Sequence, residues 1–405
     1  MKLRKSAINS QQPVQLDNFT LLHLRLYQLL GLCTVPLQLK CDPAEFSQRP
    51  QRVSTRQLRF LVIWHCLHFV FFFLLHLWTS THHDSILYNS DSFGKFNDFL
   101  KLTATITAHF VLLSETILQR KYMQKFLTLY TEVHRKWSLG TYRAECAIYR
   151  TTLSKSIFYF AIYVIIIINY IQSISKNRQW LSFFIPFMPS GLICQMRSVQ
   201  IMHFVDMLRT EVDQLNRNVE RLAMLSRRSC QANSATTGKR HHNEQVMCSE
   251  LQTFMEYYQN IYEMSILLKR TVGASIACNY VKEYVMILSE CYWSYWMVYN
   301  GHDVIEYSLI VPSAMTIFLL LITARDCMRS TNFLAHNVHK IRHDIEDFNI
   351  STRLQSFTLQ MLHQQIIIDG FGFFVLKCDM ARDMLGSIAT YMIFFIQFMP
   401  KFKSF

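Results

Sequence analysis

The stretch from Phe60 to Trp78 reads FLVIWHCLHFVFFFLLHLW, and its only polar interruptions are His65, His68 and His76. It contains no acidic residue, lysine or arginine. About 20 consecutive apolar residues let a helix cross the hydrocarbon core of a bilayer. The run therefore predicts a transmembrane helix, and we expect the chain to be an integral membrane protein.

Similar apolar runs recur along the chain. The composition is 51% hydrophobic and only 17% charged, whereas soluble domains carry about 25% charged residues. The second of the further runs is more polar than the others, and the last is short. Together with the first they predict an all-α polytopic fold of seven spans, the further six being Phe99 to Leu118, Ile157 to Ile171, Leu181 to Val205, Val272 to Val298, Tyr307 to Thr323 and Met384 to Met399.

The first apolar stretch of the chain, Phe19 to Leu39, is not expected to span. It follows a basic start but lacks a small-residue cleavage site, so it does not read as a signal peptide. We expect Leu21 to Leu32 to form an amphipathic helix at the inner membrane interface. The alternative, an eighth span, would place Arg25 within the bilayer at considerable cost.

The distribution of basic residues predicts the orientation of the chain. The net charge of +13 could suggest nucleic acid, but the Lys and Arg residues concentrate in the segments on one side of the predicted spans. By the positive-inside rule that side is cytoplasmic. We therefore expect an inverted topology, with the N-terminus inside and the C-terminus outside, and a lipid bilayer rather than nucleic acid as partner. The few basic residues on the other side are Lys95, Lys101, Lys176, Arg178, Lys401 and Lys403.

The predicted organisation has three parts. Residues 1–57 form a cytoplasmic N-terminal segment, residues 58–400 the seven-span domain, and residues 401–405 an external tail. Helices in the segments 119–150, 206–271 and 326–381 should pack as a cytoplasmic helical domain and assembly interface, because helices with one apolar stripe must bury it against each other. The clearest stripe is Leu208, Val212, Leu215, Val219 and Leu222. The polar, basic stretch from Ser226 to Gln245 is predicted to be a disordered linker.

Motifs for enzymatic or metal chemistry are weak. His336, His339 and His343 share a helical face with Asp347, a spacing that can bind Zn²⁺. A solvated or packed helical face is the favoured interpretation, because no cysteine or catalytic glutamate completes a zinc-site pattern. The sequence also lacks phosphate-binding glycine loops and nucleophile elbows. We expect no enzyme activity, metal or cofactor.

Ionisable residues within the predicted spans are costly unless they are paired or hydrated. Most lie near span ends, so structural pairing or snorkelling is favoured over a functional role. Glu290 lies deepest in its span. The set is Glu115, Arg197, Asp206, Lys282, Glu283 and Glu290.

Aromatic and polar side chains collect in the predicted outer halves of the spans. Aromatic walls with a few polar groups suit a small organic ligand, although an interfacial aromatic belt would produce a similar pattern. The candidate ligand-pocket residues are Asn169, Tyr170, Phe184, Met188, Tyr295 and Tyr307.

The last span, Met384 to Met399, is short and begins with small and polar residues, which suits a helix that faces protein or water rather than lipid. On a helical wheel Ser387, Tyr391, Phe394 and Phe398 share one face, flanked by Thr390 and Gln397. Repeated around a symmetric oligomer, this face could form a conduit that gates by dewetting. A simple buried packing helix is the competing interpretation.

The segment TYMIFFIQF, residues 390–398, resembles the TYxxxxxQF signature of insect gustatory receptors. The residues before it, including Phe357, Gly370 and Phe373, are similar to that family too, as is Leu29 to Leu32 near the N-terminus. The resemblance implies a tetrameric, ligand-gated, non-selective cation channel whose last helix lines a central pore. By this resemblance Gln397 and Phe398 map to the pore constriction, while Thr390 and Tyr391 match the signature without an assigned role.

We therefore expect a gustatory receptor channel in the plasma membrane of sensory neurons, opened by a small tastant and assembled as a homo- or hetero-tetramer. Met392 stands where the sugar-sensing branch commonly carries glutamate, which disfavours a sugar ligand. The alternative, a seven-span G-protein-coupled receptor, requires the opposite orientation. A transporter is disfavoured because internal repeats are not visible.

Overall fold

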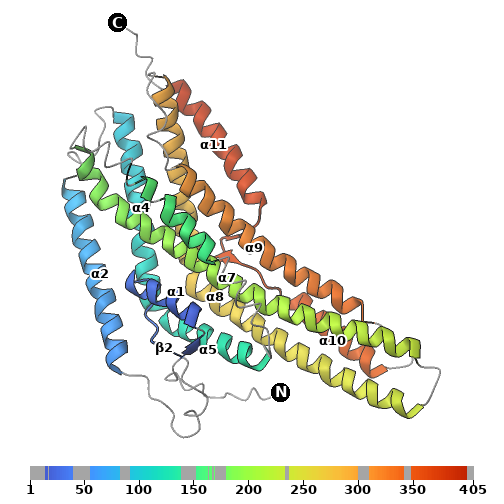
Figure 1. Cartoon of the computed structure of the whole chain (residues 1–405). Helices are drawn as coiled ribbons and strands as arrows, with labels where there is room; N and C mark the ends of the chain where they lie inside the picture. Colours follow the sequence, from blue (N-terminus) through green and yellow to red (C-terminus); the bar gives the residue numbers. More distant parts are fainter. Residues whose placement is uncertain are drawn as a thin grey trace.

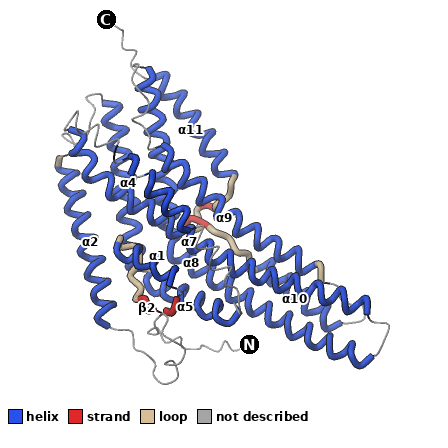
Figure 2. The backbone as a smooth tube through the Cα atoms, viewed as in Figure 1, coloured by secondary structure: helices blue, strands red, loops and turns tan. Residues whose placement is uncertain are grey.

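The computed structural model describes residues 14–16, 18–39, 55–82, 92–137, 152–162, 164–166, 168, 179–232, 237–299, 310–341 and 348–398. Almost all of these residues are helical, and the strands form two short pairs. Figures 1 and 2 show long helices packed together in a bundle. The predicted all-α fold is confirmed.

The two longest helices form the spine of the molecule. They are α7 (Gln179–Ala232) and α8 (Thr237–Tyr299). At 1.5 Å per residue they measure about 80 and 95 Å, well beyond the roughly 30 Å of a hydrocarbon core. Both therefore reach far outside any membrane that they cross. Beside one end of this spine lie α2 (Thr55–Thr81), α4 (Ser92–Leu118), much of α9 (Ile310–His339) and α11 (Asp379–Phe398), as Figure 1 shows.

The predicted spans fall on helices wherever the structure describes them. Two described helices, Arg56–Thr81 and Ile310–His339, are long and apolar enough to cross a membrane by length and composition. The predicted second, fourth, fifth and seventh spans lie within α4, α7, α8 and α11. The third falls on the partly described apolar helix at Thr152–Ile166.

The other end of the spine carries the helices predicted to be cytoplasmic. There α5 (Arg120–Trp137) and α10 (Phe348–His363) pack against α8, while α9 runs along α7. The predicted packing of the apolar stripes is confirmed, because the stripe on α7 is buried. The assembly-interface interpretation of this stripe is wrong, since Leu215 and Val219 are both 0% exposed within a single chain.

The predicted linker from Ser226 to Gln245 is largely helical. Helix α7 continues to Ala232, and α8 begins at Thr237. A polar composition does not stop a helix that is already nucleated, because adding each further residue is far easier than starting a new helix.

A polar contact joins the three helices α5, α7 and α8. The Tyr257 hydroxyl of α8 donates to Glu211 Oε2 of α7 at 2.7 Å, and His134 Nδ1 of α5 lies 2.9 Å from Glu211 Oε1. Burial, followed by the neighbouring Glu211 carboxylate, raises the pKa of Tyr257. The phenol therefore stays protonated and remains a donor to this carboxylate.

The N-terminal helix α1 (Asn18–Leu29) packs against the protein. Leu24 and Tyr27 are 0% and 1% exposed, whereas Leu22 and Leu29 face outward. Its 12 residues are too few to cross a bilayer, which excludes the eighth-span alternative. Gly31, at φ 73°, ends the helix, and strands β1 (Val14–Leu16) and β2 (Leu37–Leu39) pair in parallel.

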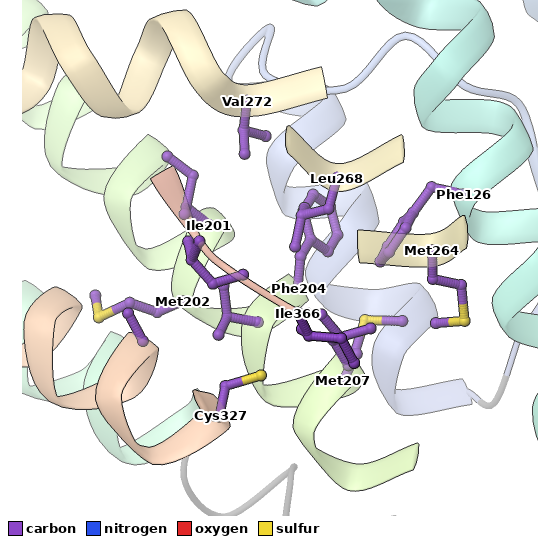
Figure 3. Packing of buried hydrophobic residues seen from close by; sticks show 14 of the residues in the cluster. Phe126, Ile201, Met202, Phe204, Met207, Met264, Leu268, Val272, Cys327 and Ile366 are labelled. Atoms are coloured by element: carbon purple, nitrogen blue, oxygen red, sulfur yellow. The ribbon is translucent and has the colours of Figure 1, made fainter. Parts of the chain in front are cut away.

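The main hydrophobic core lies where α5, α7, α8 and α9 meet (Figure 3). Phe204 of α7 meets Phe126 of α5 edge-on, with ring centroids 5.5 Å apart. Leu268 of α8 and Cys327 of α9 belong to the same cluster. Ile366, which follows α10, also enters this core, so the chain between α10 and α11 is anchored to the bundle.

A short hairpin connects α10 to α11. Strand β3 (Asp369–Gly370) pairs antiparallel with β4 (Phe374–Val375). The turn between them places Phe371 at φ 55° and Gly372 at φ 81°. A bulky residue in the left-handed region is rare, so surrounding contacts must hold the turn in this conformation. We call residues 369–375 the β3–β4 turn.

Candidate functional site

Helix α11 is covered along only one narrow face. Among its described side chains only Met384 and Ile388, one turn apart, are buried in the core. Leu385, Ile393 and Phe394 are 63%, 59% and 49% exposed. A single chain therefore leaves most of this apolar helix exposed.

Helix α8 supplies the polar contacts that position α11. The Tyr284 hydroxyl and Ser387 Oγ lie 2.6 Å apart, and the Tyr280 hydroxyl donates to the Met380 carbonyl at 3.5 Å. Ser387 therefore contacts α8 near the beginning of α11. Tyr391 and Phe394 lie on the same helical face but are about half exposed.

The remaining motif residues stay uncovered as far as their side chains are described. Tyr391 is 48% exposed, and Thr390 and Gln397 are also exposed. The Thr390 hydroxyl donates to the Gly386 carbonyl of its own helix at 3.0 Å. The side chain of Phe398 lies outside the described part of the chain. The structure thus brings Tyr391, Phe394 and Gln397 to the open side of α11.

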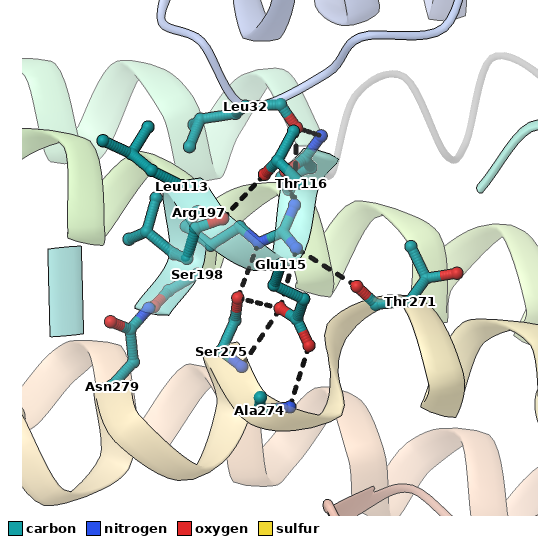
Figure 4. A network of polar contacts seen from close by, with 12 residues as sticks. Leu32, Leu113, Glu115, Thr116, Arg197, Ser198, Thr271, Ala274, Ser275 and Asn279 are labelled. Carbon is teal, nitrogen blue, oxygen red and sulfur yellow. Dashed lines mark hydrogen bonds and ion pairs between the residues drawn. The ribbon is translucent and has the colours of Figure 1, made fainter. Parts of the chain in front are cut away.

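Arg197 of α7 is fully buried at the centre of a polar network (Figure 4). Nε donates to Ser275 Oγ at 3.1 Å. One terminal nitrogen donates to Gln200 Oε1 at 2.7 Å and to the Leu32 carbonyl at 3.4 Å. The other donates to Glu115 at 3.1 Å and to the Thr271 carbonyl at 3.3 Å. All five guanidinium hydrogens thus have an acceptor.

Glu115 of α4 completes the network on the side of α8. Its two oxygens accept the backbone N–H groups of Ala274 at 2.9 Å and Ser275 at 3.1 Å, and the Ser275 hydroxyl also donates to it. The carboxylate therefore has a counter-charge and three further donors, which offsets the cost of removing it from water.

The other ionisable residues in the predicted spans are paired as well. Glu290 of α8 pairs with Lys101 of α4, and Asp206 of α7 pairs with Lys155 at 2.8 Å. Lys282 and Glu283 pair with each other at 2.6 Å. All six ionisable residues of the predicted spans are therefore paired within the protein.

The Lys101–Glu290 pair belongs to a buried polar seam between α4 and α8. One turn away the Ser289 hydroxyl donates to Asn97 Oδ1 at 2.8 Å. The Trp293 indole donates to Asp98 at 3.1 Å. These polar residues carry no sequence signal that would connect them. Only the packing of α4 on α8 reveals the seam.

Beside this seam lies a small hydrophobic cluster, distinct from the main core. Phe187 and Met188 of α7 meet Leu102 of α4 and Met286 of α8, and Ile166 joins them. The ammonium of Lys101 lies 5.6 Å from the centre of the Phe187 ring. We call these five apolar residues the outer cluster. It combines an apolar wall with a buried charge pair, as small-molecule sites do.

A family model described as 7tm chemosensory receptor matches residues 20–402. The chain belongs to this family. The Drosophila melanogaster protein named gustatory receptor 2a is 22% identical to this chain over 340 residues, which cover 76% of this chain and 79% of that protein. The resemblance seen in the C-terminal motif is confirmed at the level of the family.

The fold is that of the insect olfactory receptor OR5 from Machilis hrabei. Its structure in complex with eugenol superposes with a TM-score of 0.62 at 11% identity, covering 93% of this chain and 97% of that chain. A second structure of OR5 gives a TM-score of 0.57 at 12% identity, covering 94% of this chain and 97% of that chain.

The receptor's predicted ligand-pocket residues are only partly within the described ranges. Met188 is buried in the outer cluster. Tyr295 is half-buried, and its ring stacks on Tyr299 with centroids 6.3 Å apart. Asn169, Tyr170 and Tyr307 lie outside the described residues, as does the side chain of Phe184. Leu102 and Met286 of the outer cluster were not among the predicted pocket residues, because ordinary apolar residues carry no functional signal of their own.

The histidine motif of the receptor stays without support as a metal site. His336 and His339 lie at the end of α9, while His343 and Asp347 lie outside the described residues. Within the residues that the structure does describe, no group of three or more His, Cys, Asp or Glu side chains could hold a metal ion.

Proposed function

We propose that this receptor is a ligand-gated, non-selective cation channel that responds to small tastants or contact chemicals in sensory neurons. The family match over residues 20–402 supports a chemosensory role. The observation that carries the channel mechanism is the uncovered side of α11, where Tyr391 and Gln397 stay exposed in the single chain. Such a helix needs further protein, lipid or water around it.

Four copies arranged around an axis would bring the open sides of α11 together. Phe394 and Phe398 would then form apolar rings that close the pore by excluding water. Gln397 would offer its amide to passing hydrated ions. Thr390 and Tyr391 lie earlier on the same helix and take no proposed role in closure.

The outer cluster is the proposed ligand region. Met188 and Phe187 supply an apolar wall, and the Lys101–Glu290 pair lies beside it. Met188 belongs to the predicted pocket set, and OR5 binds the small organic molecule eugenol. A ligand inserted here would separate α4, α7 and α8, the helices that also contact one another through the buried ion pairs.

The proposed membrane arrangement has seven spans, with the N-terminus in the cytoplasm and the C-terminus outside. The helices at 119–150, 206–271 and 326–381 would form the cytoplasmic anchor domain of a homo- or hetero-tetramer. A G-protein-coupled receptor would require the opposite orientation, and the family match gives that alternative no support.

Substitution of Phe394→Ser tests the gate without a known ligand. A hydroxyl in place of a phenyl ring should keep the constriction wet, so cations should leak through the resting channel. The measurement is whole-cell current in the absence of ligand, divided by the amount of receptor at the cell surface. We expect a standing cation current about tenfold that of the wild type. Such a change corresponds to a shift of about 1.4 kcal/mol in the equilibrium between the closed and the open channel.

Ile393→Ser is the matched control. Ile393 is similarly exposed on the same helix but points about 100° away from Phe394, because successive helical residues differ by that angle. It should leave the resting current unchanged. Equal currents from both variants, or reduced surface expression without current from Phe394→Ser, would mean that α11 packs and does not gate.

A further inference from the structure

The network around Arg197 enters the hydrogen-bond ladder of α8. In an α-helix the N–H of Ser275 would ordinarily donate to the carbonyl of Thr271. Here that N–H donates to Glu115 at 3.1 Å, while the Thr271 carbonyl accepts from Arg197 at 3.3 Å. The N–H of Ala274 also donates to Glu115, at 2.9 Å (Figure 4). An ion pair from two other helices thus bonds the backbone of Thr271, Ala274 and Ser275 in the middle of α8, which stays helical there.

Two local features make this part of α8 adaptable. Gly273 lies between the engaged residues, and glycine weakens a helix interior. The Thr271 hydroxyl donates back to the Leu267 carbonyl at 2.7 Å, a contact that often bends helices. Side chains inserted into the ladder are a recognised cause of helix bending. The geometry of residues 271–275 therefore depends on Glu115 and Arg197.

The same residues of α8 support the β3–β4 turn. A Cβ at Gly273 would lie 3.2 Å from the backbone nitrogen and 3.3 Å from the Cα of Phe371, so the two backbones are in close contact. One turn earlier, Lys269 Nζ pairs with Asp369 at 2.6 Å. Asp369 also accepts the N–H of Gly372 at 3.2 Å. These contacts hold Phe371 at its unusual φ of 55°.

The β3–β4 turn leads directly into α11. Only residues 376–378 separate β4 from the first residue of α11, Asp379. Leu376 is fully buried, and its N–H donates to the Ile368 carbonyl at 2.9 Å. Phe374 packs on Tyr280 of α8 with ring centroids 5.2 Å apart. A shift of the turn would therefore move the beginning of α11.

We propose that Glu115 and Arg197 are positioning residues for α11. They act through α8 because they fix residues 271–275, these residues support the β3–β4 turn, and the turn sets where α11 begins. Arg197 also bonds the Leu32 carbonyl beyond α1, so the N-terminal segment is held by the same centre. This deepens the proposed channel function, since it links helices α4 and α7 of the outer cluster to the pore helix.

Hydrogen–deuterium exchange on the full chain in lipid nanodiscs tests this positioning without a ligand or a current. Glu115→Gln keeps the size of the side chain but loses its charge and one acceptor oxygen. We expect peptides covering residues 271–275 and 369–375 to exchange roughly tenfold faster, because a buried hydrogen-bonded charge is lost and local opening becomes easier.

Glu290→Gln is the matched control, since it breaks another buried pair between α4 and α8 far along α8 from Gly273. It should leave the exchange of the β3–β4 turn unchanged. A turn that is equally loosened in both variants would reduce the effect of Glu115 to general destabilisation and overturn the proposal. So would a turn that exchanges at the wild-type rate in Glu115→Gln.

Gly273→Ala disturbs the contact between α8 and the β3–β4 turn directly and leaves the Arg197–Glu115 ion pair in place. Its added methyl group must displace Phe371, so the turn should exchange faster while residues 97–101 and 289–293 keep their protection. If Glu115→Gln does not fold, this variant decides alone, and an unaffected turn rejects the proposal. Neither result depends on channel activity. The positioning role can therefore fail while the channel function stands, and the channel function can fail while the positioning role stands.

Discussion

Arg197 shows how this fold tolerates charge in its interior. The residue is fully buried, yet every N–H of its guanidinium has an acceptor, and the opposing carboxylate of Glu115 has three other donors. A buried ion pair gains stability only when its remaining hydrogen-bonding groups are also satisfied. Breaking such a pair from one side should therefore be far more damaging than removing both partners.

The Lys101–Glu290 pair offers a test of this asymmetry. Lys101→Met leaves the Glu290 carboxylate buried without its counter-charge and should destabilise the receptor by about 3–5 kcal/mol. The double substitution Lys101→Met with Glu290→Met removes both charges and should recover most of that loss. Thermal unfolding of the purified receptor in detergent measures both. A double variant that is no more stable than the single one would show that the pair itself is strongly stabilising.

Sequence alone identified the buried charges but not their partners. Arg197 and Glu115 stood out because ionisable residues are costly within spans. They are 82 positions apart, and Lys101 and Glu290 are 189 apart, so no local spacing rule connects them. Lys101 was counted among the basic residues of the outer side, and its 4% exposure within the protein is visible only in the folded chain.

At the scale of the helix, burial within one chain decides what an apolar stripe does. The stripe on α7 resembles a coiled-coil seam, and such seams often join subunits. In this receptor α9 and α8 already cover it. A second copy of the chain is not needed to bury Leu215 or Val219, so these residues stabilise the subunit itself.

Leu215→Asp should therefore unfold the subunit rather than dissociate an oligomer. An unpaired carboxylate at a position of 0% exposure costs several kcal/mol, on the order of the value for an unsatisfied buried polar group. The measurement is the melting temperature and yield of detergent-solubilised receptor. Leu225→Asp is the control, because Leu225 lies on the same helix with 57% exposure and should change stability by only about 0.5 kcal/mol. Folded monomers from Leu215→Asp would restore the interface interpretation.

Helix positions and periodic stripes could be predicted from sequence, whereas helix ends and helix faces could not. Residues 226–232 and 237–245 look like a linker because they are polar, yet they extend α7 and α8. Ser387 lies on the same helical face as Tyr391 and Phe394, and only the folded chain shows that the Tyr284 hydroxyl of α8 contacts it.

Helices α2 and α11 both expose apolar side chains, and they lie on different sides of the bundle (Figure 1). Helix α2 exposes Phe60, Leu67 and Phe71 by 66%, 59% and 61%, and α11 exposes Leu385 and Ile393 to a similar degree. Continuous apolar exposure along α2 suits lipid. Helix α11 differs, because its sequence interleaves apolar residues with Gly386, Thr390 and Gln397, which suits water and neighbouring protein.

Several basic residues lie close together where α4 leads into α5. Arg270 of α8 lies 5.5 Å from the Tyr122 ring of α5, with Lys269 next to Arg270 in sequence and Arg120 and Lys121 next to Tyr122. Basic residues at span ends mark the cytoplasmic side. The proposed inverted orientation therefore assigns this group to the cytoplasm.

An epitope tag after Phe405 should therefore be stained on intact cells, and a tag before Met1 only after permeabilisation. The reason is electrostatic, because Lys and Arg near span ends are retained on the cytoplasmic side during insertion. Seven spans then carry the C-terminus to the outside. Staining of both tags on each side of the membrane, normalised to total receptor, makes the measurement independent of expression. The reverse pattern would favour a G-protein-coupled orientation, and two tags on the same side would require an even number of spans and would remove α11 from its proposed place in the pore.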